Sequence, residues 1–269
     1  MKARIKFQKY GAMKFIGHLD VMRYFQKAFR RAGFDNEYSK GFNPHQIMSF
    51  AAPLGVGLTS DAEYLDISLL SSDEPEVMME RINAVLTEGF RVVDFHLLLE
   101  PEANTRVASA MSLVASADYL VSLKDGYSIE GISSQQELKR AFMTFFEPDE
   151  IFINKKTKTT EKEVNIKPMI SLLAFDEDEY KAGLKPLLNS DIKLFESESC
   201  AQKYENGIRL YMQLDTGSSA NLKPEMVMEA FYDSLGLSYN KFAWQVHRLE
   251  IYARDRVRKK LTPLYALAR

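Results

Sequence analysis

The sequence predicts an α+β protein made of two tandem ferredoxin-like (split βαβ) units with antiparallel sheets. Short stretches that alternate polar and apolar residues recur along the chain, and such alternation is typical of half-buried strands. Between them lie segments whose apolar residues recur at three- and four-residue steps, as in amphipathic helices. Each half of the chain gives the order strand, helix, strand, strand, helix, strand, which is that of the split βαβ motif.

The first half supplies one copy of this order. Its expected elements are a strand at 2–9, a helix at 18–32, short strands at 35–39 and 45–51, a strand at 63–69, a helix at 74–87 and a strand at 90–99. In the first strand, Ala3, Ile5 and Phe7 share one side, and the other side is expected to be open. The helix is expected to bury Leu19, Met22, Phe25, Phe29 and Ala32.

The second half repeats the order without visible sequence similarity to the first. Its expected elements are a strand at 118–124, a helix at 133–146, strands at 151–154 and 163–167, a strand at 208–214, a helix at 224–235 and a strand at 245–252. Ser134 and Glu137 have the spacing of a capping box. We therefore expect domains at 1–100 and 117–269, with an irregular acidic insertion near 175–205 in the second.

Composition excludes several classes of protein. The single cysteine, Cys200, rules out an internal disulfide, a Cys-rich zinc site and an all-cysteine iron–sulfur cluster within one chain. No segment has the length of a membrane span, and the N-terminus lacks an apolar signal core. We expect a cytoplasmic protein that makes no membrane contact and holds no metal and no cofactor.

The net charge of −2 conceals an uneven distribution. Residues 1–50 contain ten Lys/Arg and three Asp/Glu, a net of +7, and residues 240–269 contain eight and two, a net of +6. Basic ends that meet in space would attract a phosphate polymer such as RNA, although each cluster can equally be a solvated outer face. The candidate RNA-binding residues are Lys2, Arg4, Lys6, Arg23, Lys27, Arg30, Arg31, Arg256 and Arg258.

A catalytic interpretation rests on His18, Tyr38 and His45. His18 begins the first helix, whose dipole is expected to lower the pKa of its imidazole. If the three side chains converge, they could supply the base and the acid of metal-independent RNA cleavage. The alternative is that His18 has a structural role at the helix start. No P-loop occurs, and no dinucleotide-binding glycine motif.

One segment resembles a known family. Its motifs are Phe15-Ile-Gly-His18-Leu-Asp20 followed by Arg23, Arg30-Arg-Ala-Gly33, Tyr38-Ser-Lys-Gly41-Phe-Asn-Pro44-His, Pro53-Leu-Gly55-Val-Gly57 and Glu63-Tyr-Leu-Asp. These motifs, dense over about residues 1–70, are similar to the bacterial radical SAM-associated (radical SAM-linked) family, a domain of unknown function. Gly17 departs from the serine that is frequent there.

The resemblance implies a cobalamin-binding radical SAM protein as partner. This chain lacks the three-cysteine motif of the radical enzyme itself, so its expected function is that of a non-enzymatic accessory protein that binds tRNA or rRNA for modification. A metal-independent endoribonuclease and a protein–protein adaptor are the alternatives. The paired ferredoxin-like pattern is also similar, at the level of fold alone, to CRISPR repeat-processing endoribonucleases, which is a weak argument for function.

Overall fold

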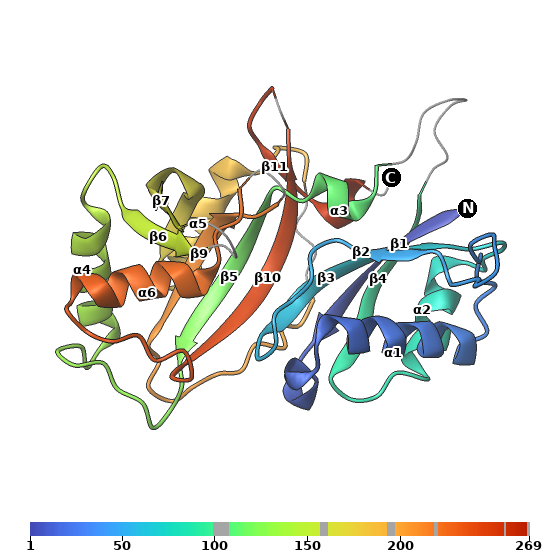
Figure 1. Ribbon diagram of the computed structural model, residues 1–269, viewed down its shortest axis with the longest axis horizontal. Helices are drawn as coiled ribbons and strands as arrows, with labels where there is room; N and C mark the ends of the chain where they lie inside the picture. The colour runs from blue at the N-terminus through green and yellow to red at the C-terminus, as the bar shows by residue number, and fades with distance from the viewer. Residues whose placement is uncertain (99–107, 157–160, 193–196, 218–219, 256, 268–269) are drawn as a thin grey trace. The chain divides into compact units, whose positions relative to one another are not determined.

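The computed structural model describes residues 1–98, 108–156, 161–192, 197–217, 220–255 and 257–267 (Figure 1). These residues form an α+β protein with six α-helices and eleven β-strands, which confirms the predicted class. The chain forms two compact units. Unit 1 comprises Met1–Val114, Leu188–Ala201 and Arg248–Arg269, and unit 2 comprises Ala115–Leu187 and Gln202–His247. The predicted consecutive domains, 1–100 and 117–269, stay a prediction.

Unit 1 contains an antiparallel sheet with strand order β4-β1-β3, and the short β2 pairs with β3. Its elements are β1 (Lys2–Lys9), α1 (His18–Arg31), β2 (Met48–Phe50), β3 (Thr59–Ser68), α2 (Pro75–Asn83), β4 (Phe90–Leu98), α3 (Ala110–Leu113), residues 248–254 of β10 (Trp244–Arg254) and β11 (Leu261–Pro263). Helices α1 and α2 cover one face of the sheet (Figure 1). The apolar core between them includes Phe7, Phe25 and Ile82, each at most 1% exposed.

The residues of β1 are buried on both sides after Lys2, which corrects the expectation of an open face. Ala3, Ile5 and Phe7 pack in the core under the helices, as predicted. Arg4 and Lys6 face the other side, where they meet backbone and side chains of remote segments of unit 1, including residues 248–264. The alternation was recognised correctly, but it could not indicate that both sides are covered.

Two local predictions for unit 1 were right only in part. Of the stripe expected on the first helix, Phe25, Phe29 and Ala32 are buried and Met22 packs against the core, whereas Leu19 is 61% exposed. Of the two strands expected at 35–39 and 45–51, only β2 forms, and Asn36–Leu69 and Tyr38–Gln46 are isolated bridges. The segment pairs at single positions, and so it does not form a regular ladder.

Unit 2 contains the antiparallel strand order β5-β9-β8 and a separate β6–β7 hairpin. Its elements are β5 (Ser116–Leu123), α4 (Gln135–Phe146), β6 (Phe152–Lys156), β7 (Glu161–Asn165), β8 (Ile170–Ala174), α5 (Glu177–Leu184), β9 (Arg209–Asp215), α6 (Pro224–Ser234) and residues 244–247 of β10. The predicted helix start is confirmed: the side chain of the N-cap residue Ser134 accepts from the Glu137 amide, and the Glu137 carboxylate accepts from the amide of Ser133, one residue earlier. Helices α4 and α6 pack through Phe142 and Phe231, whose ring centroids are 4.2 Å apart.

The acidic stretch near 175–205, which was expected to be irregular, contains helix α5. Asp176 caps this helix by accepting a hydrogen bond from the Glu179 amide at 2.7 Å. The helix has only eight residues, three of them acids in its first turn, so its apolar periodicity is too short to be recognised. No helix in the described part of the chain is long and apolar enough to cross a membrane.

Candidate functional site

The Glu63-Tyr-Leu-Asp motif lies on β3 of unit 1 and carries buried polar contacts. The Asp66 carboxylate accepts from Arg4 Nε at 2.8 Å, from Arg4 Nη2 at 3.1 Å and from the Ala110 amide at 2.7 Å. Arg4 Nη1 also donates to the Leu264 carbonyl at 3.2 Å. The Arg4 side chain is only 1% exposed, so this ion pair holds α3 and the C-terminal segment against the sheet.

A second buried pair lies beside it. The Glu250 carboxylate accepts from Lys6 Nζ at 2.7 Å and from the Tyr64 hydroxyl at 2.6 Å. The sequence grouped Lys2, Arg4 and Lys6 as an exposed basic row for RNA. Only Lys2 is exposed, because the charges of Arg4 and Lys6 are used inside unit 1, where a buried charge requires a partner. Both are therefore corrected from surface residues to structural ones.

A third buried pair joins Glu63 to Arg248. Arg248 Nη1 lies 2.8 and 3.1 Å from the two carboxylate oxygens and donates to the Ala52 carbonyl at 3.1 Å. Burial raises the pKa of Glu63, while the nearby Arg248 charge opposes this shift. Lys9, also buried, donates to the Ile16 carbonyl at 3.1 Å, and burial lowers the pKa of its ammonium.

His18 is the first residue of α1 and lines a small pocket with Lys9, Phe50, Leu54 and Glu63. Its ring meets that of Phe50 edge to face, with centroids 5.1 Å apart. Burial lowers the pKa of His18, and the Lys9 charge lowers it further. The direction agrees with the prediction, but these causes differ from the predicted helix dipole. The pocket joins the His18, Pro-Leu-Gly and Glu63 motifs.

Tyr38 and His45 lie elsewhere in unit 1, on an exposed turn. The His45 Nδ1 atom is 2.8 Å from the Ser39 hydroxyl, and its amide donates to the same oxygen at 3.1 Å. Within the described residues, no hydrogen bond, ion pair or ring contact joins His18 to Tyr38 or His45. The three residues proposed for catalysis thus make separate local contacts.

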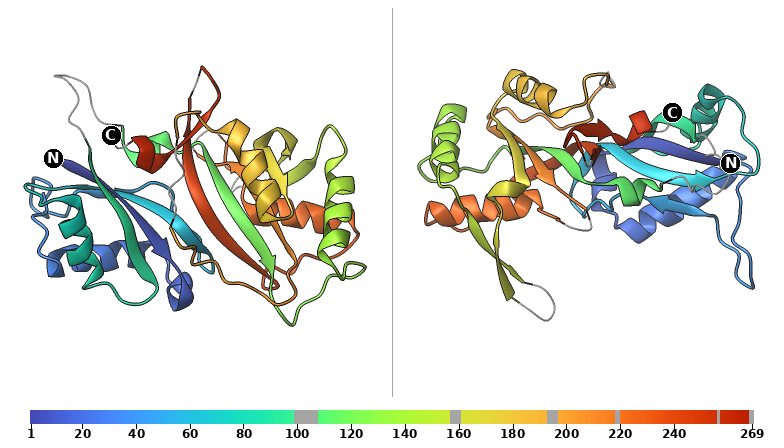
Figure 2. Two further views of the ribbon diagram at one scale, coloured as in Figure 1. Left: turned by 180° about the vertical axis from the view of Figure 1, so that it is seen from behind. Right: turned by 90° about the horizontal axis from the view of Figure 1, so that it is seen from above.

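The turn at 38–45 projects from the rest of unit 1 (Figure 2, right). Two backbone hydrogen bonds hold its base: Ser39 donates to His45 at 2.9 Å and Ile47 to Glu37 at 3.0 Å. At its tip Gly41 has a φ of +119°, which favours glycine. The neighbouring Phe42 side chain is fully exposed. An ordered turn therefore presents an aromatic ring to solvent. Phe42 was not among the binding residues predicted from the sequence.

The basic residues of α1 are exposed as predicted. Arg23 lies 3.5 Å from Asp20, the only acid in the helix, and both side chains are more than half exposed. Arg31 donates to the Val85 carbonyl at 3.2 Å. Lys27 and Arg30 have neither an ion pair nor a side-chain hydrogen bond within the described residues. This helix thus carries a nearly unbalanced positive face.

The remaining basic candidates lie near the C-terminus. Arg258 is exposed, and its amide donates to the Asp255 carboxylate at 2.8 Å. Arg256 lies outside the described residues. Arg258 is thus a surface residue, as the sequence predicted, and its backbone is bound by Asp255.

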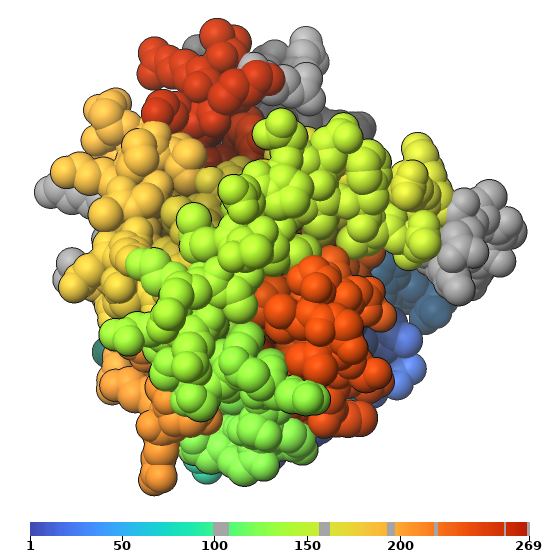
Figure 3. All heavy atoms as spheres, turned by 90° about the vertical axis from the view of Figure 1, so that its left-hand side faces the viewer, coloured from blue at the N-terminus to red at the C-terminus, as the bar shows by residue number. Residues whose placement is uncertain are grey.

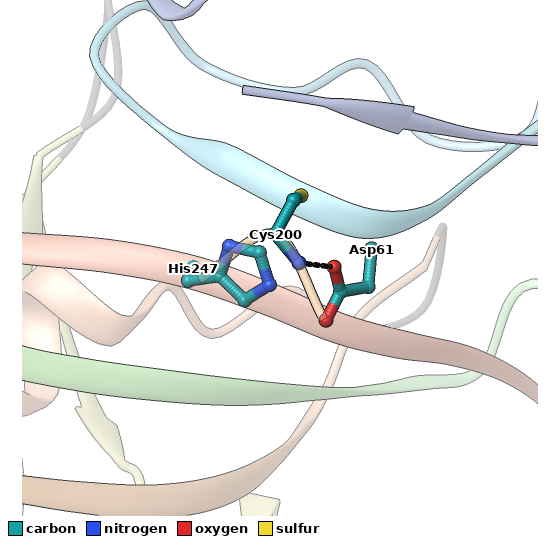
Figure 4. Close-up of side chains that lie close together, drawn as sticks. All are labelled: Asp61, Cys200 and His247. Atoms are coloured by element: carbon teal, nitrogen blue, oxygen red, sulfur yellow. Dashed lines mark hydrogen bonds between the residues drawn. The ribbon is translucent and has the colours of Figure 1, made fainter. Parts of the chain in front are cut away.

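Cys200 is tied to Asp61 of β3 (Figure 4). The Asp61 carboxylate accepts from the Cys200 amide at 2.7 Å, the Ser199 hydroxyl at 2.5 Å and Gln8 Nε2 at 3.2 Å. Burial, together with the Asp61 charge, raises the pKa of the Cys200 thiol. The thiol therefore stays protonated and is a poor nucleophile, and Asp61 fixes residues 199–200 to the sheet.

A known protein family matches most of the chain. Residues 2–224 match the model of DUF2344, described as an uncharacterized protein conserved in bacteria. The chain belongs to this family, because the match covers most of its length. No curated protein is similar to the chain at a significant level.

Proposed function

We propose that this DUF2344 protein binds RNA through unit 1 and acts as a non-enzymatic accessory protein of a radical SAM enzyme. The positive face of α1 carries the RNA part of the proposal, since Arg23, Lys27, Arg30 and Arg31 are all exposed and face a single acid. Lysines and arginines in such a row bind phosphates and release counterions. The radical SAM partner, a cobalamin-binding protein, follows from the motif resemblance alone.

We infer a split βαβ arrangement for each unit. In unit 1 the order β4-β1-β3, with β2 beside β3, is the order expected of a ferredoxin-like sheet. In unit 2, β5, β9 and β8 take the corresponding places. In this arrangement both sides of β1 are buried, so we assign RNA binding to helix α1 and to the turn at 38–45 rather than to a sheet face.

The turn supports unpaired RNA as the ligand. Phe42 is fully exposed, Tyr38 is 44% exposed, and Lys40 and His45 are exposed beside them. Aromatic rings stack on unpaired bases, and neighbouring cations contact the backbone. Lys2 and Arg258 are further exposed basic positions in unit 1. A base that stacks on Phe42 would thus be bound by an ordered loop.

Geometry favours binding over cleavage. A metal-independent endoribonuclease would need a base and an acid at one phosphate. His18 instead lies against Phe50 in a small pocket, while Tyr38 and His45 lie on the projecting turn. We therefore propose that His18 helps to pack the start of α1.

The double substitution Arg23→Glu, Arg30→Glu should abolish measurable RNA binding without unfolding the protein. The single substitutions Arg23→Glu and Arg30→Glu, which should each remove one phosphate contact and leave measurable binding, should reduce the magnitude of the slope of log K against log salt by about 0.7 for single strands. Binding of host tRNA and rRNA would be measured by fluorescence anisotropy over a range of salt concentrations. Lys185→Glu, Lys203→Glu is the matched control, because both residues are exposed in unit 2. Equal loss in both variants, or unchanged affinity in the first, would contradict the assignment.

Phe42→Ala should weaken binding to single-stranded RNA by about 1–3 kcal/mol, the range for one stacked base. Binding to duplex RNA should change little, because paired bases are not available for stacking. Phe42→Tyr, which keeps the aromatic ring, should restore most of the affinity. The comparison is made by anisotropy with single-stranded and duplex RNA of the same sequence. Equal weakening on both RNAs would argue against stacking.

A further inference from the structure

Unit 2 contains a groove of about 1220 Å³ between β6, α4 and α6. Figure 3 shows α6 in orange, with the green and yellow-green atoms of α4 and of the β6 region beside it. The groove belongs entirely to unit 2, and it is separate from the residues assigned to RNA. A groove of this size, formed by a strand and two helices, can accept an extended chain.

Among the described residues β6 pairs with β7 alone, and its other edge faces this groove. Every residue from Glu150 to Lys155 lines the groove. If a face of the strand bordered the groove, only alternate residues would line it, so it is the edge of the strand that borders it. The pairing register gives the same result. Ile166 donates to the Ile151 carbonyl at 2.8 Å, so hydrogen-bonded pairs of the antiparallel hairpin fall on odd residues of β6. The amides and carbonyls of Phe152 and Asn154 therefore point away from β7.

The opposite wall carries apolar side chains among polar ones. Phe145 of α4 and Met226 and Ala230 of α6 line the groove, together with Leu235 just after α6. Phe152 also lines it and is 50% exposed. An edge of polar backbone on one side, and apolar positions among the side chains on the other, match the needs of an added β-strand, whose alternate side chains point to opposite faces.

The charges at the rim differ from one end to the other. Lys155 donates to the Asn221 carbonyl at 3.0 Å, which places it near Lys223 and the start of α6. Acidic residues lie along the other part of the lining, at Glu150, Glu229 and Asp233. These carboxylates disfavour a phosphate polymer and favour a peptide that carries charges of both signs.

We propose that this groove binds an extended segment of a partner protein as a third strand beside β6. The segment has apolar side chains at alternate positions against α4 and α6. It carries an acidic residue at the end beside Lys155 and Lys223, and a basic residue at the end beside Glu150 and Asp233. The proposal does not depend on RNA binding by unit 1.

The test uses a fluorescent library of short synthetic peptides with alternating apolar and polar residues. Each peptide has glutamate at one end and lysine at the other, in both directions. The best binder is then N-methylated at alternate residues in either of two frames. Methylation in the frame that faces β6 should weaken binding by about tenfold or more, since it removes the edge hydrogen bonds. Methylation in the other frame should have little effect.

Two variants of the full chain test the location. Ala230→Arg should block the groove and abolish binding, whereas Ala182→Arg, on the exposed side of α5, should leave it unchanged. Hydrogen exchange at the Phe152 and Asn154 amides should slow when the peptide is added. The proposal is overturned if no peptide binds, if both methylation frames act alike, if Ala230→Arg binds normally, or if single-stranded RNA competes for the groove.

Discussion

Asp66→Ala should lower the free energy of unfolding by about 3–5 kcal/mol, the usual result of removing one partner from a buried ion pair. The Arg4 side chain would remain buried at 1% exposure, with the Leu264 and Ala108 carbonyls as its remaining acceptors. The Ala110 amide would also lose its carboxylate partner. Urea unfolding followed by circular dichroism measures the change.

Asp73→Ala is the matched control for this prediction. It also removes an aspartate from an arginine, Arg81, at 2.6 Å, but the Asp73 side chain is 59% exposed. Solvent screens such a pair, so the expected loss is at most about 1 kcal/mol. Similar losses of unfolding free energy in both variants would show that burial of the Arg4 charge does not increase the cost of removing its partner.

The sequence was informative where local pattern decides structure. The starts of α4 and α6 follow from Ser134 and Pro224, a capping residue and a first-turn proline. The projecting turn follows from its Gly-Phe-Asn-Pro residues. These features depend on neighbours within a few residues, so one sequence is enough to recognise them. The exposed basic face of α1 was predicted for the same reason.

The buried ion pairs could not be found in this way. Arg4 meets a carbonyl 260 residues away, at Leu264, and Lys6 meets Glu250. Alternation in β1 showed that these residues share a side, but not that remote segments cover that side. The motif at Glu63, Tyr64 and Asp66 was the available signal, because acids inside a strand with apolar neighbours require partners. The partners of these acids lie far away in the sequence, so only the folded structure identifies them.

Arg248→Met should destabilise the protein by about 3–5 kcal/mol at neutral pH, because the Glu63 carboxylate would stay buried without its ion-pair partner. Burial already raises the pKa of Glu63, and Arg248 opposes that shift, so the substitution should raise this pKa further. Lys9 remains nearby as the other positive charge. A carboxyl whose pKa is higher in the folded state takes up a proton on folding, so its contribution to stability falls as pH rises.

This sign gives a specific pH dependence. Below the unfolded pKa of a glutamate, Glu63 is protonated in both states and the loss caused by Arg248→Met should be smallest. The loss should grow as pH rises through the folded pKa of Glu63. Urea unfolding at a series of pH values measures it, and Glu63→Gln in the Arg248→Met background should remove the dependence. A loss that is equal at every pH would mean that Arg248 stabilises the protein through packing and its bond to Ala52, rather than through the charge of Glu63.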